Sequence, residues 1–382
     1  MSEPSALQPA SPLCPHFGPC GGCQLQDIAY PAQLRLKRSR LEEILRSAGL
    51  DVLPEIAVHC AGPWSYRNRI RLRLQTSGSE RRVGYNHTGG SDFLPITTCP
   101  ITAPVLWNAA EALLAAAAQN RDAASWFDAS TQVELFCNHD LSCVQLTLLC
   151  VKKPSFAPLS FTRAMAALDL PQLAGAGAVF VGPHTGRPLR TLAETGATGL
   201  AYRVGEEAYW VSRGSFFQVN RFLLGTLVQL VCNGRSGELV WDLFAGVGLF
   251  SRVLARGFAQ VTAVEANPIA ANDLRSGLAK LSPQHSAVTS DVLDFLRSAV
   301  LQRDRPELIV LDPPRAGAGM EACALLLRLA PRTLVYVSCD PNTLARDLRV
   351  LHPNYRIAHL HLVDLFPQTS HIETVAVLER FS

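Results

Sequence analysis

Three side chains with reactive groups stand next to apolar segments in the C-terminal half of the chain. Asp312 directly follows the apolar run 307–311, Cys339 closely follows the run 333–337, and Glu373 opens the last apolar run. A cysteine thiolate is a nucleophile, and a carboxylate can take up a proton. Brought into one pocket, these groups would form a covalent bond to a substrate, move a proton and break the bond again.

The segments that carry these residues have the pattern of an α/β fold. Apolar strands are expected at 238–243, 260–264, 307–311 and 333–337, and helical stretches separate them. This alternation is typical of a doubly wound, parallel, Rossmann-like sheet. Ligands bind such sheets at the carboxyl ends of the strands, so Asp312 and Cys339 are expected to emerge at the same edge.

The first of these strands leads into a glycine turn, D-L-F-A-G-V-G-L-F-S over 242–251, and a helix is expected after it. Glycines there let a ligand lie against the backbone and over the helix N-terminus, so Gly246 is a candidate cofactor-binding residue. Glu265 ends the second strand nineteen residues later, where an acid accepts hydrogen bonds from ribose hydroxyls. Asp291 follows where the adenine edge would lie.

Two classes of cofactor compete for this turn. A dinucleotide fingerprint needs a third glycine at position 251, where this chain has serine. The acidic Asp242 inside the turn also suits a cationic, phosphate-free cofactor better than a pyrophosphate. The turn therefore favours S-adenosylmethionine (SAM), a methyl donor.

A methyl donor beside a cysteine and an acid indicates a particular reaction. Carbon 5 of uracil is too poor a nucleophile to attack a sulfonium methyl directly, but a thiolate added at carbon 6 creates an enolate that makes carbon 5 nucleophilic. A base must then remove the carbon 5 proton before the thiol leaves. Cys339 fits the nucleophile, because a cysteine at a polar strand end beside a methyl donor is placed for more than core packing. Glu373 fits the base, and His371 is the second candidate.

Length and composition limit the class of protein. The 382 residues are enough for about two to three domains, and 48% hydrophobic residues exclude a disordered chain. Eleven cysteines, a polar start without a signal peptide and the lack of a run of ~20 apolar residues predict a cytoplasmic protein with reduced thiols and no membrane contact. The net charge of +3 does not by itself indicate a nucleic-acid partner.

One local pattern does favour a nucleic acid. Arg67, Arg69, Arg71 and Arg73 occupy every second position, so a strand would place all four on one face. A solvated outer strand rarely carries four arginines and no acid, whereas a phosphate-facing sheet would, because each neutralised phosphate releases counterions. We therefore expect this strand to face nucleic acid.

Six sequence blocks resemble those of the RNA uracil-5-methyltransferases, which include bacterial ribosomal and transfer-RNA enzymes. The blocks are G-S-F-F-Q-V-N from Gly214, D-L-F-A-G-V-G-L-F from Asp242, V-E-A-N-P from Val264, L-D-P-P-R from Leu311, V-S-C-D-P-N-T-L-A-R-D from Val337 and S-H-I-E-T-V from Ser370. The resemblance spans nearly the whole C-terminal half and implies that Cys339 is the nucleophile and Glu373 the base. It also implies that a further set of residues binds the cofactor or frames the uracil, namely Gln218, Phe244, Glu265, Asp291 and Asp312.

Four cysteines near the N-terminus also match this family. Cys14, Cys20, Cys23 and Cys99 look like the iron–sulfur ligand set of its ribosomal branch. The spacing alone leaves a [4Fe–4S] cluster and a structural zinc ion open, and the resemblance favours the cluster. The transfer-RNA enzymes generally lack these cysteines, which points to 23S ribosomal RNA as the substrate. Only thirteen residues precede Cys14, too few for the small RNA-binding barrel (TRAM domain) of many ribosomal members, so RNA capture is expected in the central domain.

These features divide the chain into four parts. We expect a flexible tail at 1–13, a cysteine-rich iron–sulfur segment with a helix at 14–60, a central α+β RNA-binding domain at 61–205 whose Cys99 returns to the cluster, and a SAM-dependent methyltransferase domain at 206–382. We expect the protein to bind ribosomal RNA as a monomer, without a protein partner.

Three other functions fit the sequence less well. The same chemistry on the transfer-RNA T-loop needs no different active site, so only the methylated RNA separates these two substrates. A non-catalytic RNA-binding module would need neither Cys339 nor Glu373. A radical SAM enzyme would need a C-x3-C-x2-C triplet, whereas this chain has C-x5-C-x2-C and a fourth candidate ligand.

Overall fold

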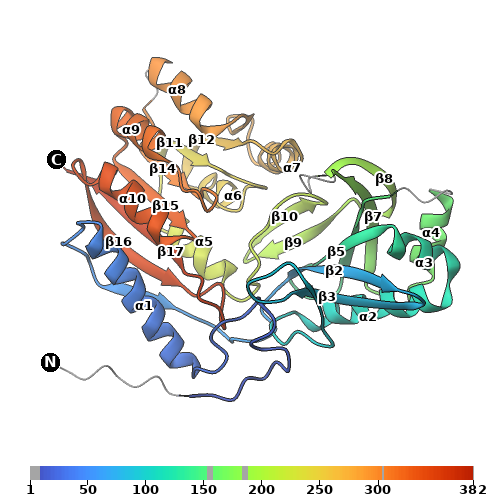
Figure 1. The fold of residues 1–382 in the computed structure, drawn as a ribbon. Helices are drawn as coiled ribbons and strands as arrows, with labels where there is room; N and C mark the ends of the chain where they lie inside the picture. Colours follow the sequence, from blue (N-terminus) through green and yellow to red (C-terminus); the bar gives the residue numbers. More distant parts are fainter. Residues whose placement is uncertain (1–8, 153–157, 183–187, 303–304, 382) are drawn as a thin grey trace.

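The computed structural model describes residues 9–152, 158–182, 188–302 and 305–381. These residues form two lobes, each built around its own large sheet (Figure 1). The larger lobe contains the C-terminal half together with the first helix, and the smaller lobe holds the middle of the chain (Figure 1). Most of the expected flexible tail, residues 1–8, lies outside the described residues.

The larger lobe is organised around an eight-stranded sheet with the strand order β1-β16-β17-β15-β14-β11-β12-β13. β17 is antiparallel to both of its neighbours, and the other strand pairs are parallel. The strands are β1 (Ile56–His59), β11 (Gly237–Leu243), β12 (Phe258–Glu265), β13 (Ser286–Thr289), β14 (Leu308–Leu311), β15 (Thr333–Ser338), β16 (Tyr355–Val363) and β17 (Glu373–Arg380).

Helices cover both faces of this sheet, which explains why its central strands are apolar throughout. One face packs against α1 (Tyr30–Ser47), α8 (Val292–Gln302), α9 (Met320–Leu329) and α10 (Pro341–Leu351). The other face packs against α5 (Leu224–Cys232), α6 (Ser251–Leu254) and α7 (Pro268–Leu278). Successive side chains of β15 point to opposite faces of the sheet. Tyr336 packs into the core on the first face and Val335 into the core on the second.

The smaller lobe contains a seven-stranded sheet with the order β4-β3-β2-β5-β6-β7-β8. Its strands are β2 (Arg69–Ser77), β3 (Glu80–Asn86), β4 (Phe93–Pro95), β5 (Ser130–Cys137), β6 (Val144–Cys150), β7 (Leu173–Val181) and β8 (Pro188–Gly196). The helices α2 (Pro104–Gln119), α3 (Arg121–Asp128) and α4 (Leu159–Ala166) pack on it around the buried Trp126 and Phe127. A hairpin of β9 (Gly199–Val204) and β10 (Glu207–Ser212) follows and shares its core with α5 and α6.

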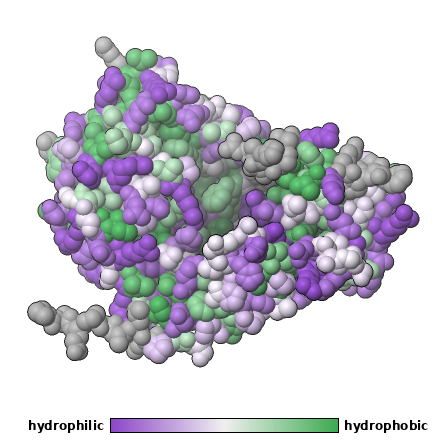
Figure 2. Space-filling model, in the orientation of Figure 1, coloured by the Kyte–Doolittle hydropathy of each residue, from purple (hydrophilic) through white to green (hydrophobic). Residues whose placement is uncertain are grey.

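Hydrogen bonds join the two lobes. The Asn68 side-chain amide donates to the Gln218 carbonyl at 3.0 Å, and the Arg69 guanidinium donates to the Ser215 carbonyl at 2.8 Å. Figure 2 shows a recess between the lobes with hydrophobic residues at its floor. The block 214–220 therefore lies at the junction, between the smaller lobe and the edge of the larger sheet.

The expected α/β sheet is confirmed, and each strand predicted in the C-terminal half forms within two residues of its expected bounds. The expected division of the chain differs from the packing in two places. α1 and β1 belong to the larger lobe, because Leu41 and Leu45 enter its core and β1 pairs with β16. The expected boundary between 205 and 206 falls in the turn of the β9–β10 hairpin. Within the described ranges, no helix is long and apolar enough to cross a membrane.

Candidate active site

The three reactive residues predicted from the sequence meet at one edge of the larger sheet. β14 and β15 are parallel neighbours, so Asp312 and Cys339 both follow carboxyl ends of strands. β17 runs antiparallel beside β15, in a register that pairs Ser338 with Thr374. This register places Glu373 opposite Cys339 across the two strands.

Burial and negative charge dominate the electrostatics around Cys339. Burial, followed by the charges of Glu373 and Asp312, raises the pKa of its thiol to about 11, although Arg315 acts in the opposite direction. Glu373 is only 2% exposed, and burial together with the Asp312 charge raises its pKa well above the usual range, against the influence of Arg315. A carboxylate with a raised pKa is a stronger base, which suits proton removal.

Asp312 and Gln218 form a polar wall at the same edge of the sheet. Burial, and then the charge of Asp242, raise the pKa of Asp312 to about 7. The Gln218 amide donates a hydrogen bond to Asp312 Oδ2 at 3.2 Å, which favours the ionised carboxylate. Gln218 reaches Asp312 from the junction of the lobes, so both parts of the chain build this wall.

The turn after Cys339 is fixed by a helix cap. Asp340 Oδ1 accepts hydrogen bonds from the backbone N–H groups of Asn342 at 2.9 Å and Thr343 at 3.0 Å, which caps α10. Because Cys339 immediately precedes this cap, the cap fixes the direction in which the thiol leaves the sheet. No role was predicted for Asp340, although an Asp-Pro pair is a typical helix start.

Arg315 and His371 lie side by side near Cys339. Arg315 Nη2 is 3.3 Å from His371 Nε2, and the His371 ring packs against Phe366 with 5.7 Å between ring centroids. Burial lowers the pKa of His371, and the charge of Arg315 lowers it further. His371 is thus a neutral neighbour of Arg315. No role was predicted for Arg315 either, although it ends the L-D-P-P-R block.

The glycine turn after β11 has the open shape of a ligand cradle. Phe244 and Gly246 have φ values of +62° and +57°, in the left-handed region. Strain of this kind in a non-glycine residue such as Phe244 is concentrated at functional sites. A Cβ atom at Gly246 would meet no atom within 4 Å, so a ligand can lie directly against this backbone. Asp242 Oδ1 is buried without a hydrogen-bond partner among the described residues, while its other oxygen bonds Ser251.

Two further acids lie at the same edge of the sheet. Glu265 accepts hydrogen bonds from the backbone N–H groups of Gly246 at 2.8 Å and Asn267 at 2.7 Å, so it ties the second strand to the glycine turn. Asp291 follows β13, is exposed, and accepts a hydrogen bond from Leu293 N at 2.8 Å. Four of the predicted cofactor residues, Phe244, Gly246, Glu265 and Asp291, therefore lie at the carboxyl ends of β11, β12 and β13, in the same sheet as the strands that carry Asp312 and Cys339.

Comparison with known proteins identifies the family. The family described as tRNA (Uracil-5-)-methyltransferase matches residues 198–381. The 23S rRNA (uracil(1939)-C(5))-methyltransferase RlmD of Edwardsiella ictaluri is 33% identical over 97% of this chain and 82% of that protein. The enzyme of the same name from Aromatoleum aromaticum is 33% identical over 98% of this chain and 87% of its own length. The chain belongs to the RNA uracil-5-methyltransferase family.

A solved structure of this kind has the same fold. The tRNA (uracil-54, C5)-methyltransferase of Pyrococcus abyssi, in complex with S-adenosyl-L-homocysteine, is similar with a TM-score of 0.75 at 25% identity. The match covers 94% of this chain and 84% of that chain. The protein is therefore a SAM-dependent RNA uracil-5-methyltransferase, as the sequence blocks predict.

The four N-terminal cysteines of this methyltransferase line one cavity. The cavity has a volume of about 110 Å³, and Cys14, Cys20, Cys23 and Cys99 border it together with Arg67. Burial raises the pKa of Cys23 to about 11, and the other three thiols contribute in the same direction. In the part of the chain that the structure describes, no three His, Cys, Asp or Glu side chains are arranged as ligands of a metal ion. The structure thus gathers the predicted ligand set without showing a formed metal site.

The arginine strand of the methyltransferase is only partly as expected. Arg69, Arg71 and Arg73 lie on the less buried face of β2, as the alternation predicts. The neighbouring strand β5 supplies an acid that the local pattern could not reveal, because Glu134 pairs with Arg69 at 3.4 Å and with Arg71 at 2.6 Å. Arg73 donates to the Asn86 side chain at 2.7 Å. Side chains of the same chain already bind these arginines. Their contact with RNA stays a prediction.

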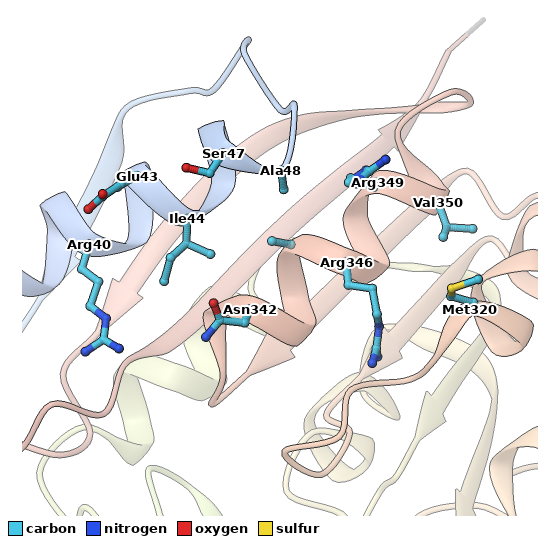
Figure 3. Close-up of a pocket in the computed structure, with 11 residues that line it drawn as sticks. Arg40, Glu43, Ile44, Ser47, Ala48, Met320, Asn342, Arg346, Arg349 and Val350 are labelled. Atoms are coloured by element: carbon cyan, nitrogen blue, oxygen red, sulfur yellow. The ribbon is translucent and has the colours of Figure 1, made fainter.

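A second basic surface lies between α1 and α10. A groove of about 790 Å³ separates the two helices, and Figure 3 shows Arg40 and Arg346 extending in the same direction along it. Arg40 and Arg349 line the groove, and within the described ranges neither side chain has a hydrogen bond or an ion pair. Asn342 also lines this groove. It lies in the first turn of α10, three residues after Cys339, so the groove reaches the turn that follows Cys339.

Proposed function

We propose that this methyltransferase modifies carbon 5 of a uridine in 23S ribosomal RNA through a transient covalent bond between Cys339 and the base. The observation that carries the proposal is the position of Cys339 opposite Glu373 across two strands, with Asp312 close enough for its charge to act on both groups. This arrangement supplies a nucleophile and a base at one place. Binding RNA without chemistry would require neither group.

Each step of the reaction has a residue to perform it. The Cys339 thiolate adds to carbon 6, and the electron pair of the carbon 5–carbon 6 double bond moves toward the oxygen on carbon 4. SAM, when bound, would supply the methyl group to carbon 5, and its sulfur would keep the electrons of the broken sulfur–methyl bond and leave as S-adenosylhomocysteine. Glu373 then takes the carbon 5 proton, the double bond forms again, and the Cys339 thiolate leaves with the bonding electrons. Glu373 finally releases this proton to solvent, so the net change at the base is one proton replaced by one methyl group.

The pocket also suits the hydrogen-bonding edge of uracil. Uracil offers one N–H donor between two carbonyl acceptors, and Asp312 with Gln218 presents both acceptor and donor groups. The Arg315 guanidinium favours the ionised forms of Cys339 and Glu373, since it lowers the pKa of both. Arg315 therefore supports both the attacking thiolate and the carboxylate base.

The residues that we propose to hold SAM lie along the neighbouring strand ends. The open backbone at Gly246 and the strained Phe244 form the floor of the cradle, and Glu265 and Asp291 present oxygens for the ribose and the adenine. Asp242 Oδ1, which has no hydrogen-bond partner among the described residues, is a buried acceptor that fits a cationic cofactor. A pyrophosphate would place negative charge against this carboxylate.

The choice of ribosomal RNA rests on the relatives and has a direct test. The two relatives at 33% identity are named as 23S rRNA enzymes, whereas the solved structure at 25% identity is of a tRNA enzyme. Mass spectrometry of both RNA classes, from cells with and without the gene, will measure 5-methyluridine at each position. Loss of one 5-methyluridine from 23S fragments is the expected result. Loss from transfer RNA would keep the chemistry and overturn the substrate, and no loss would contradict the catalytic function.

The cysteine-lined cavity carries a separate proposal. Four thiols around a cavity of about 110 Å³ support a [4Fe–4S] cluster held by Cys14, Cys20, Cys23 and Cys99, with zinc as the alternative metal. Metal analysis and visible absorption of anaerobically purified protein distinguish them. About four iron atoms per chain with a broad visible absorption are expected for the cluster. One zinc and no visible band would favour the alternative, and neither metal would contradict both.

A further inference from the structure

The loop 364–372 joins β16 to β17 and ends at the base Glu373. The β15–β17 register sets Glu373 opposite Cys339, and the loop leads directly into Glu373 at the first position of β17, yet no residue of the loop takes part in the reaction as described. The loop is held from outside by residues that lie more than 300 positions earlier in the chain. These residues belong to α1 and to the segment that follows the third cysteine, Cys23.

The first anchor is a buried ion pair. Lys37 Nζ lies 2.6 Å from Asp364 Oδ1, with side chains 2% and 0% exposed, and it also donates to the Phe366 carbonyl at 2.9 Å. The Tyr30 hydroxyl donates to the other oxygen of Asp364 at 2.8 Å. Because burying two charges costs free energy that their attraction barely offsets, a buried pair is weak evidence for stability. Its clearer effect here is geometric, since it fixes one end of the loop on α1.

The second anchor is a reciprocal pair of side-chain amides and backbone groups. The Gln33 amide donates to Gln368 Oε1 at 2.9 Å, and Gln33 Oε1 accepts from the Gln368 backbone N–H at 3.1 Å. Gln33 is fully buried, and Gln368 has a φ of +69°. A non-glycine residue keeps such a conformation only when its surroundings hold it. Gln33 therefore determines the backbone of the loop five residues before Glu373.

The third anchor comes from the cysteine-rich segment. The backbone N–H groups of Gln24 and Leu25 both donate to the Gln368 carbonyl, at 3.0 and 3.1 Å. The Gln24 side chain accepts from the Ser370 backbone N–H at 3.2 Å. Gln24 directly follows Cys23, which borders the cysteine-lined cavity. The segment that carries the cysteines thus also binds the loop three residues before the base.

We propose that Gln24, Gln33 and Lys37 are positioning residues that hold the loop 364–372 and thereby set the Glu373 carboxylate for proton removal. We call these three residues the loop clamp. The inference rests on the proposed role of Glu373 as the base. Attack by Cys339 and methyl transfer depend on the strand ends and the SAM cradle, whereas proton removal depends on Glu373. A loosened clamp therefore slows the last chemical step more than the earlier ones, and the covalent protein–RNA adduct accumulates.

The test is the variant Gln33→Leu, with Arg35→Ala on the exposed face of the same helix as the matched control. Loss of about 1.4 kcal/mol of hydrogen bonding to the loop corresponds to roughly a tenfold lower kcat. We expect this fall together with adduct visible on a denaturing gel and a KM for RNA within about twofold of the parent value. Arg35→Ala should show the parent kcat and no adduct.

A second variant keeps the test decisive if Gln33→Leu does not fold. Tyr30→Phe removes the hydroxyl that donates a hydrogen bond to Asp364. We expect this variant to accumulate adduct too, but less of it than Gln33→Leu. The inference would be overturned if folded Gln33→Leu or Tyr30→Phe protein loses kcat without accumulating adduct. It would also be overturned if only the KM for RNA changes. Glu373→Gln separates this failure from failure of the proposed function. If Glu373→Gln traps adduct and the clamp variants do not, the clamp is wrong, and if Glu373→Gln traps none, the role of Glu373 as sole base is wrong.

Discussion

Cys339 lies among groups that mostly oppose its ionisation. Burial and the two carboxylates of Glu373 and Asp312 raise the pKa of the thiol, and Arg315 is the group that acts in the other direction. A thiolate formed in this pocket is therefore scarce but strongly basic, and strong basicity accompanies strong nucleophilicity toward carbon. Burial and the Asp312 charge also raise the pKa of Glu373, and Arg315 lowers it. The ionisation of Cys339 and that of Glu373 therefore depend on the same neighbouring charges.

The variant Cys339→Ala tests whether turnover needs the Cys339 thiol while SAM binding does not. Cys339→Ala should abolish turnover, because among the described residues the other thiol at this edge, Cys60 after β1, is separated from β15 by β16 and β17. SAM binding, measured by calorimetry, should stay within about threefold of the parent, since the cradle lies on other strands. Cys323→Ala, a buried cysteine of α9, is the matched control and should retain turnover. Turnover by Cys339→Ala would contradict the covalent mechanism.

The pH dependence follows from the raised pKa of Cys339. With a thiol pKa of about 11, the thiolate fraction and hence kcat/KM should rise with pH between about 7 and 10. Arg315→Gln removes the charge that lowers this pKa, so the rising limb of the profile should move to higher pH. The rate at pH 8 should then fall by about tenfold for each pH unit through which the limb moves. Arg315→Lys keeps the charge and serves as the control. An unmoved limb in Arg315→Gln would remove Arg315 from this role.

At the scale of elements, the ends of strands and the start of a helix position the side chains of the candidate active site. β14 and β15 end at one edge, where Asp312 and Cys339 follow them, β17 runs antiparallel beside β15, and α10 begins directly after Cys339 and its cap. Short turns between rigid elements hold a side chain more firmly than a long loop does. The exception is the loop 364–372, which the loop clamp holds instead.

The cap of α10 offers a prediction at this scale. Asp340→Ala removes two hydrogen bonds to the first turn and should lower the free energy of unfolding by about 1 kcal/mol. It should also lower kcat, because the cap fixes the turn that carries Cys339. Asp340→Asn keeps an accepting oxygen and should retain most of the stability and the rate. Equal loss in both variants, seen by thermal unfolding and turnover, would show that the cap is not the cause.

At the scale of the whole molecule, RNA must reach a recess between two lobes. The arginines of β2 lie on the smaller lobe but are partly neutralised by Glu134, whereas Arg40 and Arg349 in the groove between α1 and α10 have no such partner within the described ranges. Free cations release more counterions on binding phosphate than cations already paired. The groove is therefore the better candidate for a phosphate contact outside the recess.

Salt dependence of RNA binding distinguishes the two surfaces. The double variant Arg40→Ala with Arg349→Ala should reduce the slope of log K against log salt by about two and leave kcat at saturating RNA unchanged. Arg71→Ala should change the slope by less than about one, since Glu134 lies 2.6 Å from Arg71. Filter binding at several salt concentrations measures both. A larger change for Arg71 would return the RNA contact to the arginine strand.

Local sequence patterns were enough to predict the strand ends that carry Asp312 and Cys339 and the glycine turn after β11. Strand, turn and helix follow one another over short distances at 238–251 and 333–351, and near neighbours decide such local patterns. The rule that parallel strands present their carboxyl ends at one edge then sufficed to bring Asp312 toward Cys339. For the same reason, the sequence blocks could be matched to a family before any contact was known.

Features that depend on partners far away in the chain became visible only in the folded molecule. The antiparallel register of β17 against β15 sets Glu373 opposite Cys339, Glu134 of β5 neutralises the arginines of β2, and α1 joins the C-terminal lobe. The bond between Gln33 and Gln368 spans 335 positions. No local pattern specifies such a pair, because it forms only where two buried surfaces pack and their polar groups must find each other.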